Sequence, residues 1–255
     1  MKKYLLFLWE FLVGNFKSSI FPLLLILGII VTKKFNVPYR YDVLLIYSIT
    51  IQVIMYKTKM ETKQEIYIIC IFHLVGLAME IFKVNMGSWT YPDYSITKVF
   101  GVPLYSGFMY ASVASYICQA WKNFNLSLYK WPDKWKLCLI GVVIYLNFFL
   151  NHFVPDVRYL IKIILVILFW HTIIYYEINN KYYRVPIILC FLFFGVLLWV
   201  AENIATYYGI WKYPYQSSVW KIVSLSKLSS WFLLVIISFI LVAFLKVGDK
   251  KTELN

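Results

Sequence analysis

Two glutamates with matching neighbours stand 122 residues apart in the sequence. The segment from Glu80 to Pro92 aligns without gaps on the segment from Glu202 to Pro214, and both follow the pattern E-x6-G-x-W-x-Y-P. Five of the thirteen aligned positions are identical, where composition alone predicts about one. The pattern indicates an internal duplication that places a carboxylate at an equivalent position in each half of the chain.

Each glutamate falls inside a long apolar segment, where an acidic side chain is energetically unfavourable. Carboxylates at such positions usually face a polar cavity and mark a site, which favours acid–base chemistry by Glu80 and Glu202. The structural alternative is that W-x-Y-P forms an aromatic turn at the membrane surface. Each glutamate would then extend to water, with Lys83 as a neighbouring partner for Glu80.

His73 precedes Glu80 by two helical turns, so both side chains fall on one stripe of a helix, with Gly76 between them. Gly76 permits the close approach of a neighbouring helix or of a ligand. The structural alternative for His73 is a core histidine bonded to a Ser or Tyr of another helix. Lys227 begins the last apolar segment, where it can pair with Glu202 or meet a ligand. The candidate catalytic residues are Glu80, Glu202 and His73, and the candidate substrate-binding residues are Trp89, Tyr91, Trp211, Tyr213, Asn203 and Lys227.

The three histidines and four cysteines do not form a metal-binding pattern. A structural zinc site takes four such ligands, and no predicted helix contains more than two of them. The cysteines all lie inside apolar segments, where a thiol usually packs as a small core residue. We therefore expect neither a metal nor a cofactor.

The composition indicates a membrane protein. The chain has 255 residues, of which 62% are apolar and 15% charged, whereas soluble domains have about 45–50% apolar and about 25% charged residues. The mean hydropathy is +0.70, which excludes an ordinary soluble globule. The net charge of +13 comes from basic residues that stand mostly between apolar segments, where they set topology and contact anionic lipids. The lipid bilayer is the expected partner, and a nucleic acid is not.

The apolar segments predict an all-α, polytopic helix bundle with about eight transmembrane helices, although seven remain possible. A span requires about 20 apolar residues, and the first predicted span is shorter than that. The predicted helices cover 18–33, 42–57, 65–84, 104–122, 136–154, 157–177, 185–207 and 226–246.

The duplication divides this single integral membrane domain, residues 1–255, into two pseudo-repeated four-helix halves. Residues 1–17 form an interfacial amphipathic segment in this interpretation, because Glu10 interrupts a short apolar run. The first half covers 18–122 and the second 123–246, and 247–255 is a polar tail. Both motif loops would then lie on the same side of the membrane.

The distribution of basic residues favours cytoplasmic termini. Placing the N-terminus inside assigns 15 of the 25 basic residues to inside segments, in the direction that the positive-inside rule requires. The expected location is the cytoplasmic membrane of a bacterial cell, with several passes.

Several segments together resemble the YoaT-type bacterial membrane proteins, which contain a domain of unknown function. The resemblance covers nearly the whole chain and implies a multi-pass protein of the cytoplasmic membrane, but no established activity. The segments that carry it are His73–Lys83, Gly87–Pro92, Gly101–Tyr110, Trp199–Asn203 and Ser230–Leu234.

A fainter resemblance is to the small carotenoid cyclase and hydratase membrane proteins. They also place an acidic residue before a G-x-W/Y-x-Y turn and a proline-containing helix start, like Glu80, Gly87 and Pro103 here. The cyclases follow that proline with a carboxylate, whereas Leu104 follows Pro103 in this chain. A proton donor for carbocation chemistry would therefore have to be Glu80 or Glu202.

Three functions follow as hypotheses. The first is a polar intramembrane pocket that binds a lipid or polyprenoid and modifies it by acid–base chemistry. The second is a transporter of a small molecule or an ion-coupled carrier, which suits tandem halves and paired carboxylates. The third is a non-catalytic membrane scaffold or sensor, in which the carboxylates only hold the halves together.

Overall fold

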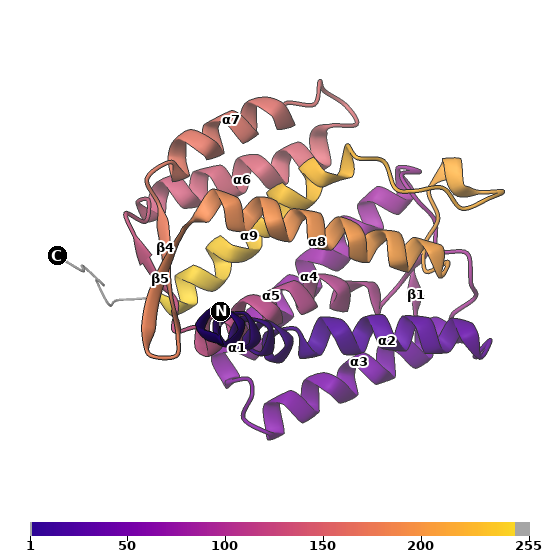
Figure 1. Ribbon diagram of the computed structural model, residues 1–255. Helices are drawn as coiled ribbons and strands as arrows, with labels where there is room; N and C mark the ends of the chain where they lie inside the picture. The colour runs from indigo at the N-terminus through magenta and orange to yellow at the C-terminus, as the bar shows by residue number, and fades with distance from the viewer. Residues whose placement is uncertain (1, 248–255) are drawn as a thin grey trace.

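The computed structural model describes residues 2–247, and side chains from Leu5 onward. This part of the chain folds into nine α-helices with two small antiparallel sheets (Figure 1). The predicted all-α class is therefore correct for the bulk of the fold, to which the sheets are an addition. The helices are α1 (Lys2–Ser18), α2 (Ile20–Lys34), α3 (Arg40–Lys57), α4 (Lys63–Asn85), α5 (Ser106–Asn123), α6 (Lys134–Leu150), α7 (Arg158–Phe169), α8 (Ile187–Tyr207) and α9 (Lys227–Lys246).

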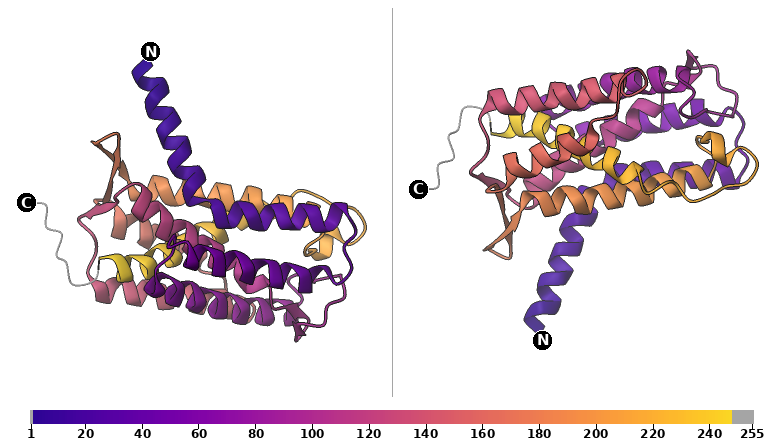
Figure 2. Two further views of the ribbon diagram at one scale, coloured as in Figure 1. Left: turned by 90° about the horizontal axis from the view of Figure 1, so that it is seen from below. Right: turned by 90° about the horizontal axis from the view of Figure 1, so that it is seen from above.

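Helix α9 forms the centre of the bundle (Figures 1 and 2). Every residue from Phe232 to Ile240 is buried, because this helix is apolar on all its faces and has no polar side to present outward. It packs against α4, α5, α6 and α8. Its first residue, Lys227, therefore enters the bundle from the end where α4 and α8 finish.

The outside of the bundle is apolar where a soluble protein would be polar. Ile46 of α3 is 67% exposed and Ile167 of α7 is 71% exposed, and similar side chains cover the outer faces of α2, α6 and α8. Such a surface indicates contact with an apolar covering, and a bilayer is one such covering. Within residues 2–247, α4, α8 and α9 are long and apolar enough to cross a membrane. The count of eight spans stays a prediction.

The N-terminal helix α1 projects from the bundle (Figure 2). Its axis makes an angle of 67° with α2, and the two helices together would meet the criteria for one broken span. One face of α1 contacts the bundle, where Phe7 packs on Tyr183 and Phe11 on Phe124. The other face exposes apolar side chains that include Trp9, as expected of a segment in a membrane interface.

The predicted helix 157–177 is wrong in its second half. Helix α7 ends at Phe169, and β4 (Ile173–Ile178) and β5 (Lys181–Pro186) form an antiparallel hairpin. Asn179 and Asn180 connect the strands with φ angles of +52° and +58°, which suits the tight hairpin turn that matches strand twist. β3 (Ser127–Tyr129) pairs with β4 as the third strand. The β-branched and aromatic run around Asn-Asn was the signal for a hairpin.

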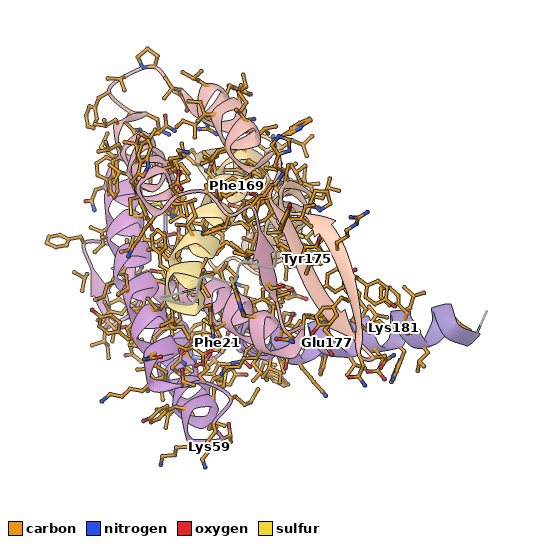
Figure 3. All side chains as sticks on the ribbon, turned by 90° about the vertical axis from the view of Figure 1, so that its left-hand side faces the viewer. Phe21, Lys59, Phe169, Tyr175, Glu177 and Lys181 are labelled. Carbon is orange, nitrogen blue, oxygen red and sulfur yellow. The ribbon has the colours of Figure 1, made fainter. Side chains whose placement is uncertain are left out.

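The second sheet is the pair β1 (Lys98–Val99) and β2 (Val102–Pro103), which lies between α4 and α5. It belongs to the opposite end of the bundle, together with the loops that carry the repeated motif. The hairpin end contains Lys59 and Lys181, which Figure 3 labels. With the N-terminus inside, the segments that connect predicted helices 42–57 and 65–84, and 157–177 and 185–207, fall inside, and they contain Lys59 and Lys181. The orientation of the chain in a membrane stays a prediction. The predicted polar tail lies outside the described residues from position 248 onward.

Glu65 holds three helices together at the hairpin end. It is 1% exposed and accepts hydrogen bonds from Lys122 Nζ of α5 at 2.6 Å and from Lys246 Nζ of α9. Thr62 and Glu65 also form a reciprocal capping box that begins α4. A carboxylate with two cationic partners is compensated here although it is buried.

We expect Glu65→Gln to destabilise the protein by about 3 kcal/mol, because two ammonium groups would lose a buried counter-ion. Thermal unfolding in detergent measures this change. Asp133→Asn is the matched control, because Asp133 and Lys136 form an exposed ion pair, with side chains 63% and 44% exposed. Its loss should change stability by no more than about 0.5 kcal/mol. Equal melting temperatures for the two variants would contradict the role given to Glu65.

Candidate functional site

The two copies of the motif end their helices in the same way. Gly87 after α4 and Gly209 after α8 have φ angles of +71° and +68°, and both follow a helix C-terminus of the Schellman type. Ser88 N donates to Lys83 O at 2.9 Å, and the equivalent Ile210 N donates to the equivalent carbonyl of α8 at 3.0 Å. Glycine is favoured at both positions because it adopts a positive φ at less cost than other residues.

The two motif loops then pair with each other. Thr90 N donates to Lys212 O at 2.9 Å and Lys212 N to Thr90 O at 2.8 Å, in an antiparallel bridge between equivalent residues. Trp89 contacts Tyr213, with ring centroids 5.9 Å apart, and Tyr91 contacts Trp211 at 6.4 Å. The tryptophan of each copy therefore packs on the tyrosine of the other, which is a local two-fold relation.

Glu80 is buried and accepts three hydrogen bonds. Its Oε2 accepts from Trp89 Nε1 and from Tyr91 OH, each at 2.8 Å, and its Oε1 accepts from Tyr110 OH of α5 at 2.6 Å. Gly76 explains the contact with α5, because a Cβ at this position would lie 2.7 Å from Tyr110 Cβ. The predicted close approach at Gly76 is therefore made by a neighbouring helix.

Glu202 is buried in a similar way but with a different second donor. Its Oε1 accepts from Tyr213 OH, the equivalent of Tyr91, and its Oε2 accepts from Trp231 Nε1 of α9 at 2.7 Å. Trp231 takes the place that Trp89 has in the first copy. The indole N–H groups can only donate, so both carboxylates serve as acceptors.

The tyrosines of the two loops remain protonated donors at neutral pH. Burial raises the pKa of Tyr91 well above its ordinary value, and the adjacent Glu80 is the second largest cause of this shift. Burial and the adjacent Glu202 do the same to the pKa of Tyr213. Neither phenol therefore ionises near neutrality.

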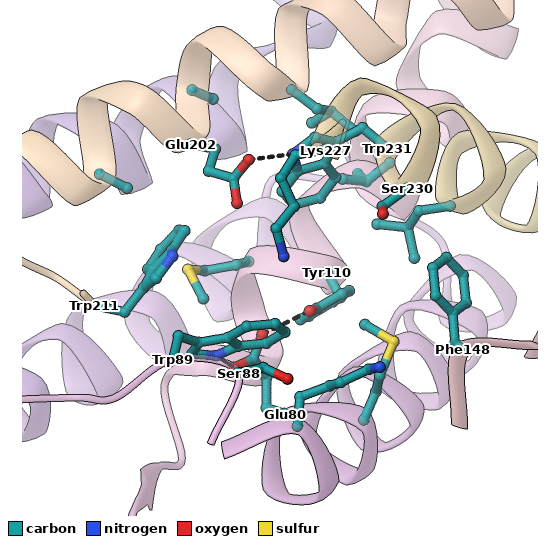
Figure 4. Close-up of a pocket in the computed structure, with 18 of the residues that line it drawn as sticks. Glu80, Ser88, Trp89, Tyr110, Phe148, Glu202, Trp211, Lys227, Ser230 and Trp231 are labelled. Carbon is teal, nitrogen blue, oxygen red and sulfur yellow. Dashed lines mark hydrogen bonds between the residues drawn. The ribbon is translucent and has the colours of Figure 1, made fainter. Parts of the chain in front are cut away.

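Glu80 and Glu202 line one cavity of about 370 Å³ (Figure 4). Lys227 extends into it between the two carboxylates, with Nζ 4.9 Å from the ring centre of Trp89 and 4.5 Å from that of Tyr213. These are cation–π contacts. The polar side chains share the cavity with apolar ones from α2, α5, α8 and α9, among them Leu25, Ile26, Met109, Val113, Leu198 and Leu234.

Of the other predicted site residues, some line this cavity and others do not reach it. Trp211 lines it, and Tyr91 stands behind Glu80. His73 does not reach it, because the imidazole packs on Phe108 with ring centroids 4.5 Å apart and lies against Gly107. Asn203 accepts from Val223 N at 2.9 Å, so it positions the segment before α9.

Sequence reasoning missed the donors Tyr110 and Trp231 and the polar rim of the cavity. The rim consists of Lys83, Ser88, Asn151, His152, Asp156, Arg158 and Ser230. Lys83 does not pair with Glu80 as the structural alternative expected, because its Nζ contacts Asn151 and His152. Asn151 and His152 stand 68 and 69 residues after Lys83, so no local sequence signal places them beside it.

Asp156 and Arg158 close the turn between α6 and α7 as a structural cap. Asp156 Oδ1 accepts from Arg158 N at 3.0 Å and from Asn147 Nδ2 at 3.3 Å, and Oδ2 accepts from the guanidinium. Burial raises the pKa of Asp156, but these hydrogen bonds and the positive charge of Arg158 outweigh it and leave the pKa below its ordinary value. This carboxylate is ionised at neutral pH and neutralises Arg158.

Arg40, the first residue of α3, ties the motif loops to the bundle. It is 4% exposed, and its guanidinium donates to Tyr208 O at 2.9 Å, to Ile29 O at 3.1 Å and to Asp93 Oδ2 at 3.4 Å. The neighbouring Tyr41 OH donates to Ile210 O at 2.7 Å. Both loops are therefore fixed from one helix end, which keeps their glutamate donors in place.

Comparison with known proteins identifies relatives without an established activity. Residues 7–239 match the sequence model of the family described as "Protein of unknown function (DUF817)". A relative from Bacillus subtilis (strain 168), described as "Uncharacterized protein YoaT", is 47% identical over 231 residues, which cover 90% of this chain and 88% of that protein. No solved structure matches. These findings confirm the resemblance to YoaT-type proteins.

We expect Gly76→Ala to destabilise the protein by about 1–2 kcal/mol, because the clash with Tyr110 outweighs the helix propensity of alanine. Gly141→Ala in α6 is the control, since a Cβ there meets nothing within 4 Å. It should stabilise by up to about 1 kcal/mol. The measurement is the melting temperature of each variant and of the wild type in detergent. A Gly76→Ala variant that is more stable than the wild type would contradict the close contact between α4 and α5.

Proposed function

Because the chain belongs to the DUF817 family, whose members are described as proteins of unknown function, we propose a function from the site itself. The protein is a multi-pass protein of the bacterial cytoplasmic membrane that binds a lipid or polyprenoid between Glu80 and Glu202. It modifies this ligand by acid–base chemistry. The termini face the cytoplasm, and the two motif-bearing halves derive from one duplicated unit.

The observation that carries the proposal is the convergence of Glu80, Glu202 and Lys227 on a cavity that also has apolar walls. Glu80 and Glu202 come from different helices, and Lys227 lies between them. Polar groups in an apolar bundle are costly unless they serve a site. The apolar side chains from α2, α5 and α8 match a hydrocarbon ligand, and the carboxylates supply groups for proton transfer.

The aromatic rings support the same chemistry. Trp89 and Tyr213 already hold a cation over their faces, the ammonium of Lys227. A carbocation formed by protonation of a double bond would be stabilised by the same electrostatic interaction. Glu80 or Glu202 would donate the proton at the start of such a step and recover one at its end, so that the step needs no other reactant.

The apolar outer surface supports the location in a membrane. Side chains such as Ile46 and Ile167 would be exposed to water in solution, and three helices have the length and apolarity of spans. The local two-fold pairing of Thr90 and Lys212 supports the duplication, because equivalent residues of the two motifs meet.

We expect Glu80→Gln and Glu202→Gln each to abolish a change in the host lipid profile that the wild-type protein causes. The reason is that a side-chain amide is neither an effective general acid nor an effective general base at neutral pH. The measurement is untargeted mass spectrometry of lipids extracted from a bacterial host that makes polyprenoids, with and without the protein. Glu177→Gln is the control, because this glutamate bonds to Asn125 near the hairpin, away from the cavity.

Identical lipid profiles for the wild type and Glu80→Gln would count against catalysis. If both cavity variants only lowered the melting temperature and no lipid changed or copurified, the scaffold or sensor hypothesis would replace the enzyme. Lipids that copurify with the wild-type protein in mild detergent should be identified in the same experiment, since they are candidates for the ligand.

An ion-coupled carrier is the second candidate, favoured by the ammonium group of Lys227 between two carboxylates whose helices end in a two-fold related pair of loops. We then expect a proton flux into proteoliposomes, reported by an internal pH-sensitive dye when a pH gradient is imposed. Glu202→Gln should remove this flux and Glu177→Gln should leave it unchanged. A flux equal to that of protein-free liposomes would exclude proton coupling under these conditions.

A further inference from the structure

Lys83 is a buried cation whose partners are all neutral. Its side chain is 7% exposed, and Nζ contacts Asn151 Oδ1 at 2.8 Å and His152 Nε2 at 3.0 Å. Ser88 Oγ lies 3.4 Å from the same imidazole nitrogen. Within residues 2–247, Lys83 has no carboxylate within 4.0 Å of its ammonium group. By contrast, Arg40 pairs with Asp93 and Arg158 pairs with Asp156.

The carboxylates of the cavity are already engaged elsewhere. Glu80 and Glu202 accept from tyrosine and tryptophan donors on both of their oxygens. Asp156 is held by Arg158. Among the described residues, no carboxylate therefore contacts the ammonium of Lys83, and Lys227 adds a second ammonium group to the same cavity. A buried cation without a counter-ion is unfavourable, and an anion at this position would remove the repulsion.

The geometry points to a binding subsite for an anionic head group, a phosphate or a carboxylate, formed by Lys83 with Asn151, His152 and Ser88. The inference rests on the proposed function and specifies its ligand as amphipathic. The head group binds at Lys83, and the hydrocarbon tail extends along apolar side chains of the same cavity, such as Leu25, Met109 and Leu198. Lys83 donates to the anion, and Ser88 provides a hydroxyl donor beside it.

The competing explanation is that Lys83 only stabilises the end of α4. A cation near a helix C-terminus interacts favourably with the helix dipole, and Lys83 lies in the last turn of that helix. This explanation predicts an effect of Lys83 on stability but none on the affinity for anions. The two roles are therefore separated by binding measurements on folded variants.

The test measures binding of decyl phosphate, decanoate, decanol and inorganic phosphate to the purified full-length protein in a nonionic detergent, by isothermal titration. We expect decyl phosphate or decanoate to bind, and the tighter of the two identifies the head group. Decanol and inorganic phosphate, which each lack one half of the amphiphile, should bind at least about tenfold more weakly.

Lys83→Met keeps the aliphatic stem and removes the charge, so it should weaken binding of the preferred anion by about tenfold. Lys83→Arg keeps the charge and should retain binding, which makes the inference testable even if Lys83→Met folds poorly. Lys162→Met is the matched control, because Lys162 of α7 donates to Ser229 of α9 and does not line the cavity. It should bind the anion as the wild type does.

Equal affinity of Lys83→Met and the wild type for decyl phosphate and decanoate would overturn the inference, as would equal binding of decanol. Failure of the inference is distinct from failure of the proposed chemistry. Glu80→Gln should still bind the anionic amphiphile although it no longer changes lipids. Loss of lipid modification in Glu80→Gln, with anion binding that is independent of Lys83, would retain the enzyme and reject the head-group site.

Discussion

The central constraint on this molecule is that two carboxylates lie inside an apolar helix bundle and must be given hydrogen-bond donors there. An unpaired carboxylate in such surroundings would be strongly destabilising. The donors come from four separate parts of the chain: Trp89 and Tyr91, Tyr110 of α5, Tyr213, and Trp231 of α9. The positions of the loops and of the central helix follow from this requirement. Arg40 and Tyr41 fix the loops through hydrogen bonds to their carbonyl groups. A displaced loop would leave a carboxylate without its donors.

The duplicated frame supports a cavity that is not symmetric. Both copies share the glycine turn, the bridge between Thr90 and Lys212 and the bond from tyrosine to glutamate. The two copies differ in the residues that line the cavity. Lys83 stands in the first copy where alanine stands at the equivalent position 205 of the second. Trp89 bonds to its own glutamate, whereas the equivalent Trp211 lines the cavity and Trp231 bonds to Glu202 in its place. A cavity with one cationic end distinguishes the two ends of an elongated ligand.

The sequence predicted the parts of the site that a local pattern encodes. The paired motif located Glu80, Glu202 and their tyrosines, and hydropathy located the helices, because these signals depend on residues close in the chain. Tyr110, Trp231 and Asn151 could not be found in this way, because their roles depend on how α5, α9 and the α6–α7 turn pack against α4 and α8. The hairpin was different. Asn179 and Asn180 between β-branched and aromatic runs carried a local signal, which overall apolarity outweighed in the prediction of helix 157–177.

The distribution of charge in the cavity connects the acid–base chemistry with head-group binding. Ordinarily a buried lysine and two nearby glutamates would form ion pairs. Here Glu80 and Glu202 are held by neutral donors, and Lys83 contacts neutral acceptors. The two carboxylates are engaged by tryptophan and tyrosine donors and do not contact Lys83, which is the reason for proposing an anionic ligand as its counter-ion. A ligand whose anionic end binds at Lys83 places its apolar part beside the glutamates and the aromatic rings, where proton transfer to a hydrocarbon chain is proposed. Under the proposed function, one arrangement of donors would serve both the acid–base chemistry and the orientation of the ligand.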